Sequence, residues 1–191
     1  MMTNKIGLIA GEGKMPVYIA QKATSKGYEV YVAGAKGNAK ENDYKTCAKV
    51  FRAFRLGQLG AGIRFFKEHG VTRVIMAGRV QHTSIFTNLM PDLRGAKFLA
   101  SLKNMQTKNI LSRVMDEFKK DGIEFEHSAL FLEDFMPQKG VLSARKPTEE
   151  EQQAAEFGYK TAKAIAALDI GLTCVVSQNA VIAVEGMEGT D

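Results

Sequence analysis

The sequence predicts an α/β protein whose N-terminal part is a doubly wound parallel sheet. The apolar run "KIGLIA" at 5–10 stops at Gly11, as a buried parallel strand does. A stretch with apolar residues at helical spacing follows at 15–26, and "YEVYVAG" at 28–34 then alternates as a second strand does. These three segments form a β-α-β unit, which in known proteins crosses over with a right hand within one parallel sheet.

Later segments continue this alternation of helices and strands. Residues 58–69 carry apolar side chains at helical spacing and are followed by a glycine, which predicts a helix. "VTRVIMAG" at 71–78 is a further buried strand that ends in glycine, and "TKNILSRVMDEFKKDG" at 107–122 is an amphipathic helix. We therefore predict that residues 1–133 form one α/β domain.

The composition changes in the C-terminal part of the chain. Residues 134–147 contain proline, glycine and lysine at short intervals, which is typical of a linker. Thr148 and Glu151 form a capping-box pattern that predicts the start of a helix, and "LTCVVSQNAVIAVEG" predicts a hairpin that turns at "QN". One helix and one hairpin bury little apolar surface. Residues 134–191 are therefore predicted to be a linker and the first part of an incomplete α+β domain, with Asp191 as a truncation point.

The composition also excludes several classes of protein. Lysine and arginine outnumber aspartate and glutamate by 26 to 21, a net charge of +5 that suits an ordinary basic surface or attraction to phosphate groups or an anionic membrane face. No nucleic-acid-binding motif is present, so no nucleic acid is expected as a partner. Cys47 and Cys174 stand far apart, which favours a reducing compartment, and no apolar run approaches the ~20 residues that span a bilayer. We expect a cytoplasmic protein.

Gly11, Glu12 and Gly13 stand where the first predicted strand leads into the first predicted helix. Glycines at this point let the backbone approach a ligand, and the helix N-terminus offers N–H groups to an anion. The alternative is a tight turn without a ligand. Two common nucleotide motifs do not fit, because a P-loop needs glycine at Leu8 and a dinucleotide fingerprint needs glycine at Pro16. We expect a phosphate-bearing ligand other than NAD or ATP.

Two further motifs follow a predicted strand end. Gly78 closes the strand at 71–78, so the loop after it lies at the carboxyl edge of the sheet, where open α/β sheets bind ligands. In a doubly wound fold this loop lies beside the first glycine loop. In "NLMPDLRG", Asp92 and Arg94 either face a polar ligand at this edge or belong to a turn and a solvated ion pair.

The last seven residues, "EGMEGTD", combine carboxylates with a hydroxyl on a glycine-rich turn. Glu185, Glu188 and Asp191, together with Thr190, are oxygen donors of the kind that hold a hard cation bridging phosphate groups. Their spacing does not specify the geometry of a metal site. The three histidines lack any ligand spacing and are expected to be structural or solvated.

Taken together, "GLIAGEGKMPV", "AGRVQHTSIFTNLMPDLRG", "LDIG" and "AVEGMEGTD" resemble the UDP-2,3-diacylglucosamine pyrophosphatase family of lipid A biosynthesis. The resemblance is to its two-domain type, distinct from the calcineurin-like metallophosphoesterases, and runs from Lys5 to Asp191. It implies hydrolysis of the pyrophosphate of UDP-2,3-diacylglucosamine to UMP and 2,3-diacylglucosamine 1-phosphate. It also implies a divalent cation, Mg²⁺ or Mn²⁺, and a site between a Rossmann-like N-terminal domain and a distinctive C-terminal domain.

The resemblance implies roles for individual residues as well. Glu188 and Asp191 would be catalytic, positioning the metal ion or the attacking water, and Arg79 would bind phosphate. The other substrate-binding positions would be Gly11, Gly13, Gly78, Asp92 and Thr190. This chain has Leu172 where many members have glutamine, and Arg79 where many have asparagine or lysine.

The acyl chains of that substrate imply a protein peripherally associated with the cytoplasmic face of the inner membrane, and the family allows a homodimer. A second hypothesis is a non-catalytic module that binds a UDP-sugar or a related nucleotide. A nucleotide-dependent oxidoreductase or transferase is disfavoured because the fingerprints are missing. The α/β scaffold hosts all three functions, so the fold alone does not choose among them.

Overall fold

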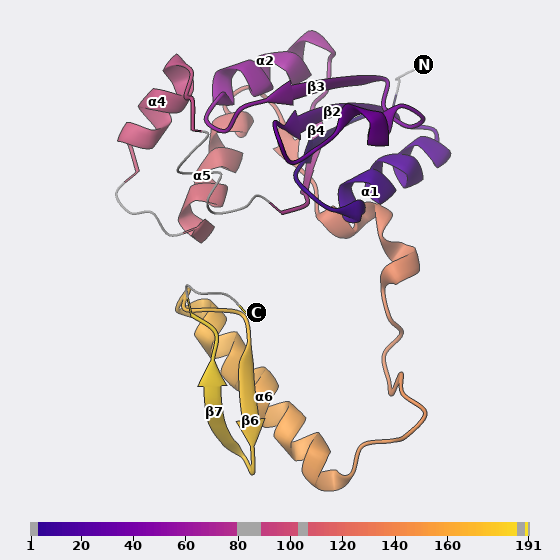
Figure 1. The fold of residues 1–191 in the computed structure, drawn as a ribbon, viewed down its shortest axis with the longest axis vertical. Coiled ribbons are helices and arrows are strands. Elements are labelled where there is room, and N and C mark those ends of the chain that lie inside the picture. Colours follow the sequence, from indigo (N-terminus) through magenta and orange to yellow (C-terminus); the bar gives the residue numbers. More distant parts are fainter. Residues whose placement is uncertain (1–3, 80–88, 103–106, 187–189, 191) are drawn as a thin grey trace. The chain divides into compact units, whose positions relative to one another are not determined.

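The computed structural model describes residues 4–79, 89–102, 107–186 and 190 of the chain. The chain divides into two compact units, Met1–Met136 and Pro137–Asp191, and Figure 1 shows the elements of each. Within the described residues, no helix is both long and apolar enough to cross a membrane.

The N-terminal unit is built on a five-stranded sheet (Figure 1). Its strands are β1 (Lys5–Ala10), β2 (Glu29–Ala35), β3 (Val50–Phe54), β4 (Arg73–Ala77) and β5 (Glu124–Phe125). They pair in the order β3-β2-β1-β4-β5, and every pairing is parallel. The chain moves outward from β1 to β3 and then returns to β4, so the strand order reverses between β1 and β4. This Rossmann-like order confirms the predicted α/β class.

Helices cover both faces of this sheet, and each face has its own apolar core. Along β2, Val30 and Val32 pack on the face covered by the first helix, whereas Tyr31 packs on the opposite face with Ile63 and Phe118. The helices in the described part of the unit are α1 (Lys14–Ser25), α2 (Leu59–Glu68), α4 (Leu93–Ala100) and α5 (Thr107–Lys119). Three short 3₁₀ turns accompany them, η1 (Glu41–Tyr44), η2 (Ser128–Phe131) and η3 (Glu133–Phe135).

The predicted strands and helices of this unit are present, with ends that differ by at most three residues. The sequence did not predict β3, α4 or β5. Strands β3 and β5 lie at the two edges of the sheet and are only partly buried, so they show no continuous apolar run. Helix α4 has only eight residues, which is too short a segment to establish a helical repeat, and it buries only Gly95.

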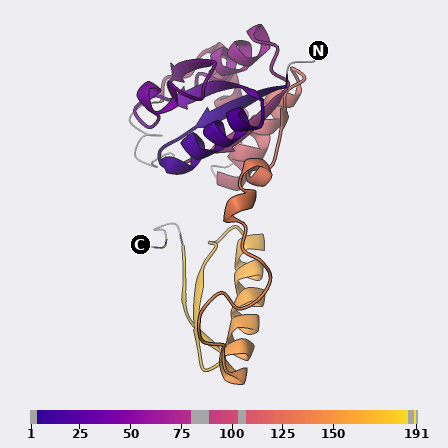
Figure 2. The same ribbon diagram turned by 90° about the vertical axis from the view of Figure 1, so that its right-hand side faces the viewer.

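The C-terminal unit contains, in its described part, one helix and one antiparallel hairpin, as predicted (Figure 2). Helix α6 (Glu149–Ala167) begins at the predicted capping box. The Glu151 N–H donates to the Thr148 hydroxyl oxygen at 3.2 Å, and the Thr148 N–H donates to the Glu151 carboxylate at 2.8 Å. The side chain of the cap and that of the third helical residue thus satisfy two otherwise unpaired N–H groups.

The hairpin consists of β6 (Cys174–Ser177) and β7 (Ala180–Val184). Gln178 and Asn179 connect the strands with φ angles of 47° and 59°, as a two-residue turn of the primed type requires. Helix α6 packs against β6. Among the described residues of this unit, however, only Ile165 is a buried apolar residue, so its core is small.

Candidate functional site

The loops that follow β1 and β4 meet at the carboxyl edge of the sheet. The Gly11 N–H donates to the carbonyl oxygen of Ala77 at 2.8 Å. One residue further on, Glu12 and Arg79 form an isolated antiparallel bridge, with N–H to carbonyl oxygen distances of 2.8 and 3.0 Å. Gly78 therefore lies beside the first glycine loop, as expected. We call residues 11–13 and 78–79 the paired loops.

Gly11 and Gly78 are packing residues within the paired loops. A Cβ atom on Gly11 would lie 2.6 Å from the carbonyl oxygen of Arg79. One on Gly78 would lie 2.7 Å from Cγ of Pro16, and Gly78 also has a φ of +92°, which disfavours any side chain. Only glycine fits at either position. Contact between these two residues and a ligand stays a prediction.

Gly13 differs from both, because a Cβ atom built on it would have no neighbour within 4 Å. It is the N-cap of α1 and provides no side-chain hydrogen bond, and the first turn of α1 carries no acidic residue. The exposed Lys14 begins the helix. N–H groups in a first helical turn lack intrahelical partners and carry partial positive charge, so this end of α1 suits an anion.

Cationic side chains gather at the same edge of the sheet. Lys36 directly follows β2, Arg55 directly follows β3, and Arg79 is the second residue after β4. All three side chains are exposed. Because the carboxyl ends of parallel strands share one edge, these cations and the N-terminus of α1 lie around the paired loops. The arrangement attracts a ligand with several phosphate oxygens.

Asp92 caps two helices at once. One carboxylate oxygen accepts from the Gly95 N–H of α4 at 2.8 Å, and the other accepts from the Ala61 N–H of α2 at 2.8 Å. Burial disfavours the charged form, but the backbone N–H groups outweigh burial and lower the pKa of Asp92 below its usual value. The structure therefore gives Asp92 a capping role, whereas its predicted contact with substrate stays a prediction.

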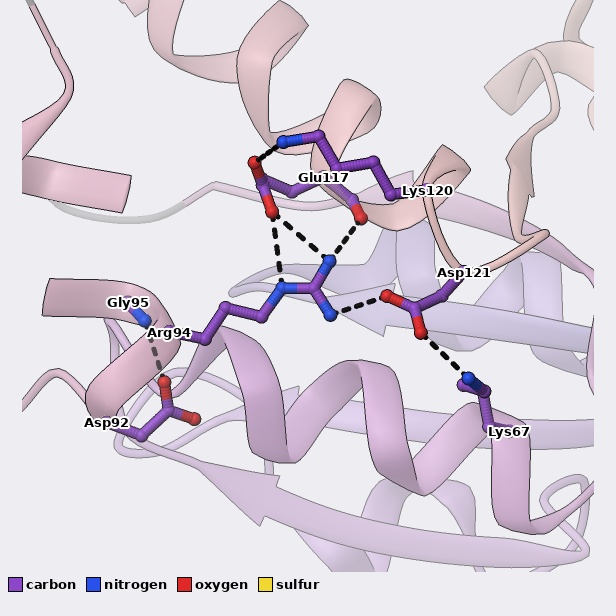
Figure 3. A network of polar contacts seen from close by, with 7 residues as sticks. All are labelled: Lys67, Asp92, Arg94, Gly95, Glu117, Lys120 and Asp121. Atoms are coloured by element: carbon purple, nitrogen blue, oxygen red, sulfur yellow. Dashed lines mark hydrogen bonds and ion pairs between the residues drawn. The ribbon is translucent and has the colours of Figure 1, made fainter. Parts of the chain in front are cut away.

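Arg94 belongs to an ion-pair network (Figure 3). Its guanidinium donates to the Glu117 carboxylate at 3.1 and 3.2 Å, to the Glu117 carbonyl oxygen at 2.8 Å, and to the Asp121 carboxylate. Lys120 also pairs with Glu117 and is the main cause of the lowered pKa of that carboxyl. Lys67 pairs with Asp121 at 2.7 Å and is the main cause of the lowered pKa of Asp121. Arg94 is therefore ion-paired with Glu117 and Asp121 in a part-buried network and not in a solvated pair with Asp92, and the bond to Glu117 ties α4 to α5. Its contact with a ligand stays a prediction.

The acidic C-terminal turn is described in part. Glu188 and Asp191 lie outside the described residues, so their catalytic and metal-binding roles stay predictions. The Thr190 hydroxyl donates to one oxygen of the Glu185 carboxylate at 2.8 Å, and the Leu172 N–H donates to the other at 2.7 Å. These bonds lower the pKa of Glu185, and the bond from Leu172 has the larger effect. Among the residues that the structure describes, no three His, Cys, Asp or Glu side chains come together to hold a metal ion.

Two features of the site were not anticipated from the sequence. One is the bridge between Glu12 and Arg79, which joins residues far apart in the chain and leaves no local pattern. The other is Pro16, whose ring lies against Gly78. A proline in the first turn of a helix was a usable signal, because proline costs nothing there and offers a rigid surface for packing.

Comparison with known proteins gives a consistent result. Residues 5–135 match the model of the LpxI N-terminal domain, and residues 138–191 match that of the LpxI C-terminal domain. The chain is also 34% identical to the UDP-2,3-diacylglucosamine pyrophosphatase LpxI of Caulobacter vibrioides, over 98% of this chain and 66% of that protein. The chain thus spans slightly less than two thirds of the length of this relative.

Solved structures resemble the chain more distantly. The UDP-glucose 4-epimerase of Thermotoga maritima, solved with UDP-glucose, is 19% identical, with a TM-score of 0.44 over 64% of this chain and 37% of that one. The UDP-glucose 4-epimerase of Bifidobacterium longum, in complex with NAD⁺ and UDP, is 14% identical, with a TM-score of 0.42 over 86% of this chain and 50% of that one. No functional statement rests on these two similarities.

Proposed function

This chain belongs to the LpxI family, and we propose that its protein hydrolyses the pyrophosphate bond of UDP-2,3-diacylglucosamine to release UMP and 2,3-diacylglucosamine 1-phosphate. The supporting observation is the group of cations around the paired loops, at the edge of the sheet where the strand order reverses. A pyrophosphate carries negative charge on both phosphate groups, and Lys36, Arg55 and Arg79 supply positive charge at this edge.

The described residues suit binding and charge stabilisation. In phosphoryl transfer, catalysis depends mainly on holding the attacking and leaving oxygens in line and on stabilising charge at the transferring group. The N–H groups at the start of α1 would bind one phosphate, and the exposed guanidinium of Arg79 would bind the other. The hydrogen bonds between Glu12 and Arg79 fix the backbone that carries this guanidinium. These groups would be in place before the substrate arrives, which is the condition for effective charge stabilisation.

A divalent cation, Mg²⁺ or Mn²⁺, is part of the proposal. The described carboxylates do not form a site for it, because Asp92 accepts from helix N–H groups and Glu185 accepts from Leu172 and Thr190. We propose Glu188 and Asp191 as its ligands.

An assay of UMP release from radiolabelled substrate dispersed in detergent tests this function. It is run with Mg²⁺ on this chain and on a protein of full family length, so that the length needed for turnover is measured directly. Asp191→Asn should abolish the release by the longer protein, whereas Asp169→Asn, at an exposed aspartate with φ of 57° that asparagine also adopts, should not. UMP release supports the proposal.

The alternative is a module that binds a UDP-sugar without hydrolysing it. Among the described residues, no three His, Cys, Asp or Glu side chains come together as a metal site requires, and this observation keeps the alternative. Tight binding of UDP-sugar by the full-length protein, with no UMP release under any metal condition, would establish it in place of the hydrolase.

A further inference from the structure

A shallow depression of about 520 Å³ lies between α2 and α4, and no residue of the paired loops lines it. Four of its lining side chains are cationic, Arg64 and Lys67 from α2 and Arg94 and Lys97 from α4. Leu93 adds an apolar group to the lining. We call these five residues the basic face.

The two carboxylates in the depression leave Arg64 and Lys97 of this face unpaired. Asp92 accepts from backbone N–H groups of α2 and α4, and Asp121 is already paired with Lys67 and Arg94. Arg64 and Lys97 are exposed, and neither has a hydrogen-bond or ion-pair partner among the described residues. The face therefore presents two cations that are available to an outside anion.

The composition and exposure of α4 complement these charges. Its sequence, "LRGAKFLA", contains two basic residues, three large apolar residues and no acidic residue. Leu93 is 76% exposed, and Gly95 is the only residue of α4 that is buried. Figure 1 shows α4 beside α2, on the outer side of the N-terminal unit. An exposed leucine between cations on a helix surface is typical of a protein that rests on a lipid headgroup layer.

We propose that the basic face docks on an anionic phospholipid surface, with Arg64 and Lys97 bound to headgroup phosphates and Leu93 inserted between the headgroups. This inference rests on the proposed function, because a substrate with two acyl chains resides in a membrane. Charge complementarity identifies the occupant: the cations are long, flexible and spread over a shallow surface, which suits mobile headgroups. The exposed Leu93 side chain adds to the binding free energy because it moves from water to the boundary between headgroups and acyl chains.

Co-sedimentation with vesicles tests the proposal on the unmodified chain and on variants. The chain should bind vesicles of phosphatidylcholine with about one quarter phosphatidylglycerol, should not bind vesicles of phosphatidylcholine alone, and should be released by salt. The double variant Arg64→Ala/Lys97→Ala should lower the partition coefficient about 30-fold, since each cation near such a surface contributes about 1 kcal/mol. The matched control is Lys40→Ala/Lys45→Ala, at exposed lysines that flank η1. It removes the same charge and should change the partition coefficient much less.

Leu93→Ser tests the apolar part. It should lower the partition coefficient at every salt concentration and leave the slope of the salt dependence unchanged, whereas the cation variant should reduce that slope. An equal loss in the Arg64/Lys97 variant and in its control overturns the proposal, and so does the absence of binding to the anionic vesicles.

UMP release from detergent-dispersed substrate distinguishes this inference from the proposed function. That assay needs no bilayer, so the Arg64→Ala/Lys97→Ala variant of the full-length protein should keep the unmodified rate. No UMP release by the unmodified full-length protein removes the proposed function, while selective vesicle binding measured in the absence of substrate still identifies the basic face as the docking surface.

Discussion

Gly11 and Gly78 approach so closely that each excludes a side chain from the other. A Cβ atom on Gly78 would lie 2.8 Å from the carbonyl carbon of Gly11, and one on Gly11 would lie 3.0 Å from that of Gly78. Because these residues follow β1 and β4, the contact joins the two strands between which the strand order reverses.

Gly11→Ala should lower the free energy of unfolding by about 1–3 kcal/mol, because the added methyl group meets the carbonyl oxygen of Arg79 and the backbone must shift. Urea unfolding followed by circular dichroism measures the change. Gly62→Ala is the control, since a Cβ atom there has no neighbour within 4 Å and alanine favours α2. That control should be neutral or stabilising. If both variants have the same free energy of unfolding, the paired loops are not in close contact in solution.

Gly13→Ala should weaken the binding of a UDP-sugar about tenfold, because φ of +110° is unfavourable for alanine and a changed N-cap would misplace the N–H groups of α1. Isothermal titration calorimetry with UDP-GlcNAc measures the affinity. Gly27→Ala is the matched control, as Gly27 has φ of +82° and open space beyond the other end of the same helix. It should lower stability and keep the affinity. Equal affinities of the Gly13 and Gly27 variants would show that the start of α1 does not bind the ligand.

Asp92→Ala should lower the free energy of unfolding by about 1–3 kcal/mol, because two helices lose an N-terminal hydrogen bond. The effect should depend on pH. The pKa of Asp92 is lowered in the folded state, so its contribution is complete above the unfolded pKa of about 3.9 and is lost as pH falls through the lower folded value.

Unfolding of both proteins at several pH values checks this dependence. The difference in their free energies of unfolding should be constant above about pH 5 and should shrink below about pH 4. A difference that grows as pH falls would show that the carboxyl is protonated, and not ionised, when it caps the two helices.

Glu151 should titrate far below an ordinary glutamate. The guanidinium of Arg145, and next the N–H of Thr148, lower its pKa from 4.5 to about 2. A lowered pKa means that the start of α6 is stabilised above about pH 4.5 and loses that stabilisation as pH falls towards 2. The side-chain carboxyl chemical shift of Glu151, recorded by NMR against pH, measures the value, with the exposed Glu150 as an internal reference. A pKa near 4.5 for Glu151 would mean that the capping box does not form in solution.

The parts of the fold that could be predicted from the sequence are those whose pattern is local. β1, β2 and β4 lie in the middle of the sheet and have no charged residue after the first one. The Thr148 capping box marks the start of α6 within four residues. Helix α4 could not be predicted in the same way. It is held by Arg94 through partners 23 and 27 residues away, and a distant ion pair leaves no periodicity in the sequence.

The candidate site shows the same division. The glycines at 11, 13 and 78 were recognisable as backbone positions of special geometry, but no local pattern separates their roles. Gly11 and Gly78 must both be glycine because their backbones are in close contact. Of the three, only Gly13 has open space where a side chain would lie. Asp92 was recognised as a polar residue at a turn, whereas its second hydrogen bond, to Ala61, depends on the packing of α4 against α2.

The bridge between Glu12 and Arg79 has a further consequence for ligand recognition. Two loops hydrogen-bonded to each other lose their backbone freedom when the domain folds, so that entropy is not lost a second time when a ligand binds. Binding at this edge should therefore be fast and should need little rearrangement of the loops themselves. A spectroscopic probe at Glu12 should report the same backbone environment with and without nucleotide, and any movement that accompanies turnover should begin in other segments of the protein.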